Sequence, residues 1–129
     1  MIKPRKKAVK APERSEEVEQ AMVVHYLNYV YPSVKYCASA GGVRTSIKQA
    51  IKMKRTGYVK GFPDIQICKA VGGYHGLFIE MKRMSGTLDK SQKEWLAALN
   101  NEGYLARCCK GFDSAKLLID QYLHGEIQK

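Results

Sequence analysis

The chain has 129 residues, 45% hydrophobic and 26% charged, which suits one globular domain with its own core. Lys and Arg number 22 against 12 Asp and Glu, so the net charge of +10 favours polyanionic partners, nucleic acid before anionic membranes. With no bilayer-spanning apolar run, no signal-peptide core and no zinc-type cysteine spacing, we expect a cytoplasmic protein (of a prokaryotic or phage-infected cell) without a membrane partner.

Residues 1–14 are predicted to form a disordered basic tail ahead of a single domain over residues 15–125. The tail carries six cations and two prolines, and it shows no apolar periodicity. Two interpretations stay open for it: a solubilising extension, or a non-specific contact with phosphates.

The first predicted helix covers residues 15–31, with Ser15 as its cap and a proline directly after its end. Acidic side chains suit the positive end of a helix dipole, and the first turn carries Glu16, Glu17 and Glu19. An apolar stripe follows at helical spacing, made of Val18, Met22, Tyr26 and Tyr29 with Val23 and Val30 beside it.

A strand over residues 34–39 and a break at residues 40–42 lead to a second helix over residues 45–55. This helix has a thin apolar side and carries Lys48, Lys52, Lys54 and Arg55. The basic side of such a helix is usually exposed to solvent. Beside a carboxylate site it is also a surface on which a phosphate backbone could rest.

The central stretch is predicted to be a hairpin of two strands, residues 65–68 and 77–82, joined by a glycine-rich loop. Alternation in the second strand puts Glu80 and Lys82 on one face, and Asp64 at the mouth of the first strand can reach the same place. Carboxylates and an ammonium gathered beside an apolar strand are costly unless a divalent cation holds them.

The C-terminal part is predicted to contain a linker over residues 84–90, a helix that ends at Gly103, a strand over 104–109 and a last helix. Ser91 and Glu94 form a capping box for the first of these helices, with Trp95, Leu96 and Leu99 inward. Asp113 or Ser114 caps the last helix, which buries Leu117, Leu118 and Tyr122 and stops at Gly125. The order of elements predicts an α/β fold with a mixed central sheet and helices on both faces.

The cysteines are predicted to be reduced thiols, mostly buried, because three of the four lie in strand-like stretches; they are Cys37, Cys68, Cys108 and Cys109.

The hairpin residues suit the hydrolysis of phosphodiesters. Mg²⁺ or Mn²⁺ prefers oxygen ligands, and Asp64, Glu80 and the backbone carbonyl of Met81 can supply them. Lys82 would orient or help deprotonate the attacking water, or stabilise the transition state. The alternative is that Glu80 and Lys82 are an ordinary same-face ion pair on an edge strand, which contributes little.

Pro63-Asp64 followed by Glu80-Met81-Lys82 resembles the signature of PD-(D/E)xK nucleases. The wider sequence resembles their VRR-NUC branch from about Ser15 to Leu123; the matching stretches are 41–42, 60–65, 73–82, 92–95 and 103–104. The resemblance implies a restriction-endonuclease-like core and a Mg²⁺- or Mn²⁺-dependent endonuclease acting on branched DNA. Small stand-alone members look like Holliday-junction resolvases and form homodimers.

The same resemblance implies two further site residues: Glu16, four positions before Gln20, as the first-helix acid, and Gln92 on the third helix. Glu17 stands next to Glu16, and the sequence leaves open which of them faces the site. Ala40 departs from the family pattern, which often has Asn there. The alternative function is a non-catalytic DNA-binding protein built on a nuclease fold.

Overall fold

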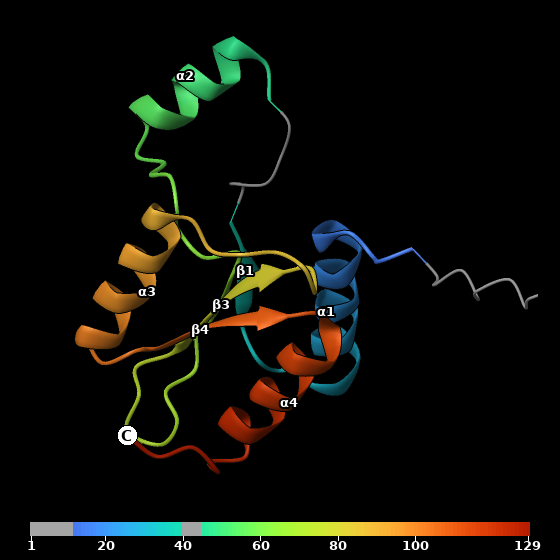
Figure 1. The fold of residues 1–129 in the computed structure, drawn as a ribbon. Helices are drawn as coiled ribbons and strands as arrows, with labels where there is room; N and C mark the ends of the chain where they lie inside the picture. Colours follow the sequence, from blue (N-terminus) through green and yellow to red (C-terminus); the bar gives the residue numbers. More distant parts are fainter. Residues whose placement is uncertain (1–11, 40–44) are drawn as a thin grey trace, which may run out of the picture.

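The computed structural model of the chain describes residues 12–39 and 45–129 (Figure 1). Most of the predicted basic tail and the predicted break at residues 40–42 therefore lie outside the described residues. The elements follow the predicted order: α1 (Glu16–Val30), β1 (Tyr36–Ala38), α2 (Ile47–Arg55), β2 (Ile65–Ile67), β3 (Leu77–Lys82), α3 (Lys90–Asn101), β4 (Leu105–Lys110) and α4 (Phe112–Leu123).

The four strands form one sheet in the order β1-β2-β3-β4. β1 pairs with β2 and β2 pairs with β3 antiparallel, whereas β3 and β4 run parallel, so the sheet is mixed as predicted. α1 and α4 lie on one face of the sheet and α3 lies on the other (Figure 1). The predicted α/β architecture is confirmed.

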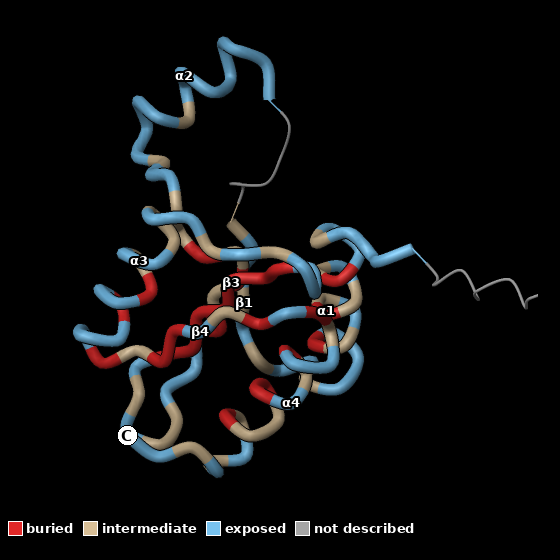
Figure 2. Tube along the Cα trace, viewed as in Figure 1, coloured by how far each residue is buried: buried red, intermediate tan, exposed pale blue. Residues whose placement is uncertain are grey.

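β3 is the centre of the core, and all six of its residues are buried (Figure 2). Leu77, Ile79 and Met81 belong to the larger apolar cluster, which α1 and α4 complete with residues such as Val23 and Leu27. On the opposite face, Phe78 packs with α3 in a second cluster that includes Leu96, Leu99 and the half-buried Trp95. The alternation predicted for β3 and the inward face predicted for α3 are both correct.

Both C-terminal helices begin differently from the prediction. α3 is capped by Asp89, whose carboxylate accepts from the backbone N–H of Gln92 at 2.9 Å, while Ser91 lies inside the helix. α4 begins directly after Gly111, which has no side chain to act as a cap. Its first turn is capped from outside: Glu19 of α1 accepts from the backbone N–H of Phe112 at 2.7 Å. A cap supplied by a distant helix leaves no local sequence signal.

The apolar stripe predicted on α1 is only partly buried. Val23 is buried as predicted and Tyr26 packs against the core, whereas Val18, Val30 and the 82% exposed Tyr29 contact solvent. α1 also buries Glu19 and Leu27, which lie outside the predicted stripe. The reason is that the sheet and α4 cover only one side of α1, so a helix with two apolar sides leaves one of them open.

Two smaller predictions of burial are also wrong. Leu117 is 59% exposed on α4, where Ala115, Leu118, Ile119 and Tyr122 face the core. Of the free cysteines only Cys109 is buried, and Cys108 is half-buried; Cys37 and Cys68 are exposed because they lie on β1 and just after β2, at the margin of the sheet. None of the helices in the described ranges is long and apolar enough to cross a membrane.

Candidate metal centre

Asp64 is fixed at the start of β2, next to the C-terminal end of β3. The antiparallel register places Ile65 opposite Ile79, so Asp64 stands opposite Glu80. Its carboxylate oxygen Oδ2 accepts from the backbone N–H of Met81 at 2.7 Å. Its carbonyl accepts from the backbone N–H of Ser39 at 2.8 Å, which ties the end of β1 to the same position. The hairpin proposed from the sequence therefore brings Asp64 to β3.

Glu80 and Lys82 lie on one face of β3, as the alternation predicted, and both are buried, with 3% and 9% of their surfaces exposed. Lys82 Nζ lies 3.8 Å from Glu80 Oε1. β3 has a strand on each side, so the alternative of a solvated ion pair on an edge strand is wrong. Two buried ionisable groups on a central strand demand compensation from other groups.

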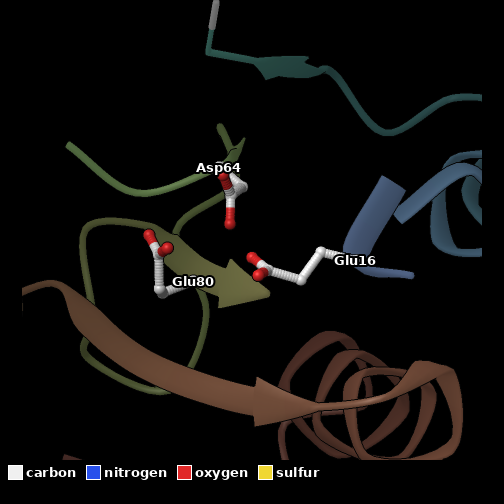
Figure 3. A group of neighbouring side chains, drawn as sticks. All are labelled: Glu16, Asp64 and Glu80. Carbon is white, nitrogen blue, oxygen red and sulfur yellow. The ribbon is translucent and has the colours of Figure 1, made fainter. Parts of the chain in front are cut away.

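Glu16 completes the cluster from the first turn of α1 (Figure 3). One carboxylate oxygen from each of Glu16, Asp64 and Glu80 can be chosen so that all lie within 4.8 Å of one another. Glu16 Oε1 also lies 3.7 Å from Lys82 Nζ, although the Glu16 side chain is 45% exposed. The geometry favours Glu16 over its exposed neighbour Glu17 as the first-helix acid.

Two contacts hold the N-terminal end of α1 at this place. The Glu13 carboxylate accepts from the backbone N–H of Ser85 at 2.6 Å and from its hydroxyl at 2.8 Å, directly after β3. The buried Glu19, one turn after Glu16, caps α4 through Phe112. Sequence reasoning missed this role of Glu19. The available signal was its spacing, since Glu19 shares a face with Val23 and Leu27, the core-facing side of α1.

Gln92 reaches the cluster from the first turn of α3. Its side-chain Nε2 donates to Glu80 Oε1 at 2.8 Å, and its Oε1 accepts from the backbone N–H of Asp89 at 3.0 Å. In the structure Gln92 orients Glu80, while the capping box orients Gln92.

The carboxylates are electrostatically strained without a cation. Burial, followed by the negative charge of Asp64, raises the pKa of Glu80 from 4.5 to about 8. Burial also raises the pKa of Asp64, against the lowering effect of its hydrogen bond from Met81. The largest cause of both pKa shifts is the same, since burial disfavours the charged form of a carboxyl group.

The site suits a small divalent cation. In an octahedral Mg²⁺ site with bonds of about 2.1 Å, ligand oxygens lie about 3 to 4.2 Å apart. The oxygens of Glu16, Asp64 and Glu80 are already within 4.8 Å, so small side-chain rotations suffice. Three carboxylates and one lysine carry a formal charge of −2, which a divalent cation neutralises. The Met81 carbonyl stays a predicted ligand.

A pH titration tests this electrostatic strain. Between pH 4.5 and about 8 the folded protein holds a proton on Glu80 that the unfolded chain has lost. The Glu80 contribution to the free energy of unfolding therefore falls as pH rises through that window. We expect wild type in EDTA to lose stability relative to Glu80→Gln from pH 5 to 8.5 in urea denaturation. Added Mn²⁺ should reverse the loss, because metal displaces the proton. Parallel pH profiles of the two proteins in EDTA would contradict the assignment.

Comparison with a family model and comparison with solved structures point to the same family. A family model described as "VRR-NUC domain" matches residues 8–113. A solved structure described as "VRR_NUC domain protein" is similar to this chain with a TM-score of 0.71 and 29% sequence identity, over 88% of this chain and 91% of that one. No curated protein matches the chain.

Proposed function

The chain belongs to the VRR-NUC domain family, a family of nucleases, and from that premise we propose that it is a divalent-metal-dependent endonuclease for branched DNA. The observation that carries the proposal is the meeting of Glu16, Asp64 and Glu80 within 4.8 Å, with Lys82 3.7 to 3.8 Å from two of them. These residues come from three separate segments of the chain and converge on one place.

The division of labour follows from the contacts. Asp64, Glu80 and Glu16 would hold Mg²⁺ or Mn²⁺, which when bound supplies charge neutralisation at the phosphate and acidifies a water. Gln92 keeps Glu80 in its orientation. Lys82, whose ammonium lies beside two of the carboxylates, orients or deprotonates the attacking water or stabilises negative charge on the phosphate. Water attacks phosphorus directly, without a covalent enzyme intermediate.

The second candidate is a non-catalytic DNA-binding protein. Its support is the net charge of +10, which binding alone would explain. The convergent carboxylates and Lys82 favour catalysis, because a binding module has no need for three acidic groups within 4.8 Å of one another. Negative charges at such a site weaken DNA binding unless a cation covers them.

A cleavage assay separates the candidates. Purified protein is incubated with a panel of end-labelled DNAs: a four-way junction, a flap, a fork, a nicked duplex and an intact duplex. The proposal expects cleavage of branched substrates in Mg²⁺ or Mn²⁺, in the manner of a Holliday-junction resolvase, and none in EDTA. Binding without cleavage in all metals would favour the non-catalytic protein. Equal cleavage of the intact duplex would contradict the preference for branches.

We further propose that two copies associate through the outward face of α1. This face and Phe112 form a groove of about 460 Å³ that is almost wholly apolar, lined among others by Val18, Met22, Tyr26, Tyr29, Val30 and Phe112. A symmetric junction needs two cuts, and a twofold-related pair of subunits supplies two sites. An exposed apolar face of this kind marks an interface.

Light scattering at micromolar concentration should give the mass of a dimer. Tyr29→Glu should convert it to monomers without unfolding, because Tyr29 is 82% exposed and the new charge would be buried between subunits. Leu117→Glu is the matched control, since Leu117 is also an exposed apolar residue but is not among those that line the groove. A monomeric wild type, with and without DNA, would refute the dimer.

A further inference from the structure

α2 stands apart from the body of the protein (Figure 1). Within the part of the chain that the structure describes, α2 has no buried residue, and most of it is exposed (Figure 2). Residues 45–60, here called the α2 arm, contain no acidic residue and five cations: Lys48, Lys52, Lys54, Arg55 and Lys60. We propose that the α2 arm binds the sugar-phosphate backbone of DNA beside the cleaved phosphate. This inference rests on the proposed function.

The segment that carries α2 begins and ends at the candidate metal centre, and both of its ends are fixed there. Before this segment, β1 ends with Ala38 opposite Ile65, and the backbone N–H of Ser39 donates to the Asp64 carbonyl at 2.8 Å. After it, the chain returns through Pro63 to Asp64 itself. A phosphate bound through a metal at the carboxylates would therefore lie next to the residues that connect the α2 arm to the sheet.

The returning limb is packed firmly against α3. Trp95 Nε1 donates to the carbonyl of Lys60 at 3.2 Å. The Phe62 ring meets the rings of Trp95 and Phe78 edge-on, with centroids 5.1 and 5.6 Å apart. Gly61 lies so close to α3 that a Cβ would come within 2.7 Å of the Ser91 carbonyl carbon. The residues that follow the helix of the arm are thus positioned by their contacts with α3, although α2 itself has no buried residue.

The helix of the arm is specified locally. Ser46 and Gln49 form a complete capping box, and Thr56 Oγ1 donates to the Lys52 carbonyl at 2.8 Å. The last turn carries Lys52, Lys54 and Arg55, whose charge suits the negative end of the helix dipole. A helix of nine residues is nevertheless marginal without a partner. Bound DNA would supply that partner.

The spacing of the cations matches a DNA strand. Lys48, Lys52 and Arg55 stand at i, i+4 and i+7, so they share one side of α2 over roughly 10 Å. A DNA strand carries one charge per about 3.4 Å of helix axis, hence about three phosphates over that length. Lys48, Lys52 and Arg55 could therefore contact three consecutive phosphates.

A second copy of the chain is the competing occupant. The neighbouring side of α2 exposes Ile47 and Ile51, at 82% and 61%. Lys54 continues that side at the next turn, so the side carries three apolar residues, Ile47, Ala50 and Ile51, a small contact for a protein interface. The absence of any acid in the arm favours a polyanion over a protein surface.

The test compares two triple variants that each remove three positive charges. Lys48→Gln/Lys52→Gln/Arg55→Gln alters the arm and keeps good helix formers. The control, Lys35→Gln/Lys69→Gln/Lys129→Gln, alters exposed lysines, two of which flank the ends of β1 and β2 remote from Asp64. DNA affinity is measured by anisotropy on a four-way junction in Ca²⁺ at several salt concentrations. Mn²⁺ affinity and light scattering are measured in parallel.

We expect the arm variant to lose affinity about tenfold or more and to lower the salt slope of log K by about 2 to 3, since each lost phosphate contact removes about 0.9. Its Mn²⁺ affinity and mass should match wild type, and the control should change the slope by less than about 1. An unchanged slope, or an equal loss in the control, would overturn the inference. So would a change of mass with an unchanged slope, which would assign the arm to a second copy. A wild type that cleaves no DNA would instead refute the proposed function itself.

Discussion

Replacement of Asp64 by Asn is expected to abolish cleavage and to weaken Mn²⁺ binding by at least about 100-fold. The amide removes a negative charge from the predicted ligand set, and metal sites lose affinity of this order even when less direct partners change. The fold should survive, because the Asn side-chain oxygen can still accept from the Met81 N–H that Asp64 now engages at 2.7 Å. Calorimetric titration with Mn²⁺ and single-turnover cleavage of a junction measure the two effects.

Asp64→Asn is expected to lose metal binding but not stability in the absence of metal. The Asp64 charge is one cause of the raised pKa of Glu80, so its removal should relieve strain in the metal-free protein. In EDTA at pH 8 the variant should be at least as stable as wild type. Asp113→Asn, which alters an exposed residue of the first turn of α4, is the control and should behave as wild type. Wild-type Mn²⁺ affinity in Asp64→Asn would remove Asp64 from the ligands.

Replacement of Lys82 by Ala is expected to lower the rate of cleavage by about two to four orders of magnitude, the usual effect of losing a positioned proton-transfer or charge-stabilising group. Metal affinity should stay the same or rise slightly, because the ammonium lies 3.7 to 3.8 Å from oxygens of Glu16 and Glu80 and repels a cation. Loss of activity with intact metal binding separates Lys82 from the ligands.

Lys110→Ala supplies a matched control for this experiment. Lys110 stands opposite Lys82 in the parallel register of β3 and β4, but it is exposed. It should retain the wild-type rate of cleavage. Junction binding in Ca²⁺ should survive in both variants, apart from one lost phosphate contact. If Lys82→Ala cleaves at nearly the wild-type rate, the proposed role of Lys82 is wrong.

Features of this protein that depend on local sequence pattern can be predicted without the structure. Alternation along residues 77–82 predicted the two faces of β3, and the hairpin predicted that Asp64 would stand beside Glu80 and Lys82. Ser15 and the acidic turn after it placed the start of α1. These predictions hold because strand period and helix caps are set by residues within a few positions of one another.

Which side of each helix is covered depends on contacts between segments that are distant in the chain. Sequence periodicity predicts an apolar stripe on α1, but the position of α4 and the sheet buries Glu19 and Leu27 beside Val23 and leaves Tyr29 in solvent. The placement of α1 also decided that Glu16, rather than Glu17, faces Asp64 and Glu80. The start of α4 depends on Glu19, 93 positions away in the chain. Contacts between distant segments form only when the whole fold closes, so their partners leave no mark within a local stretch of sequence.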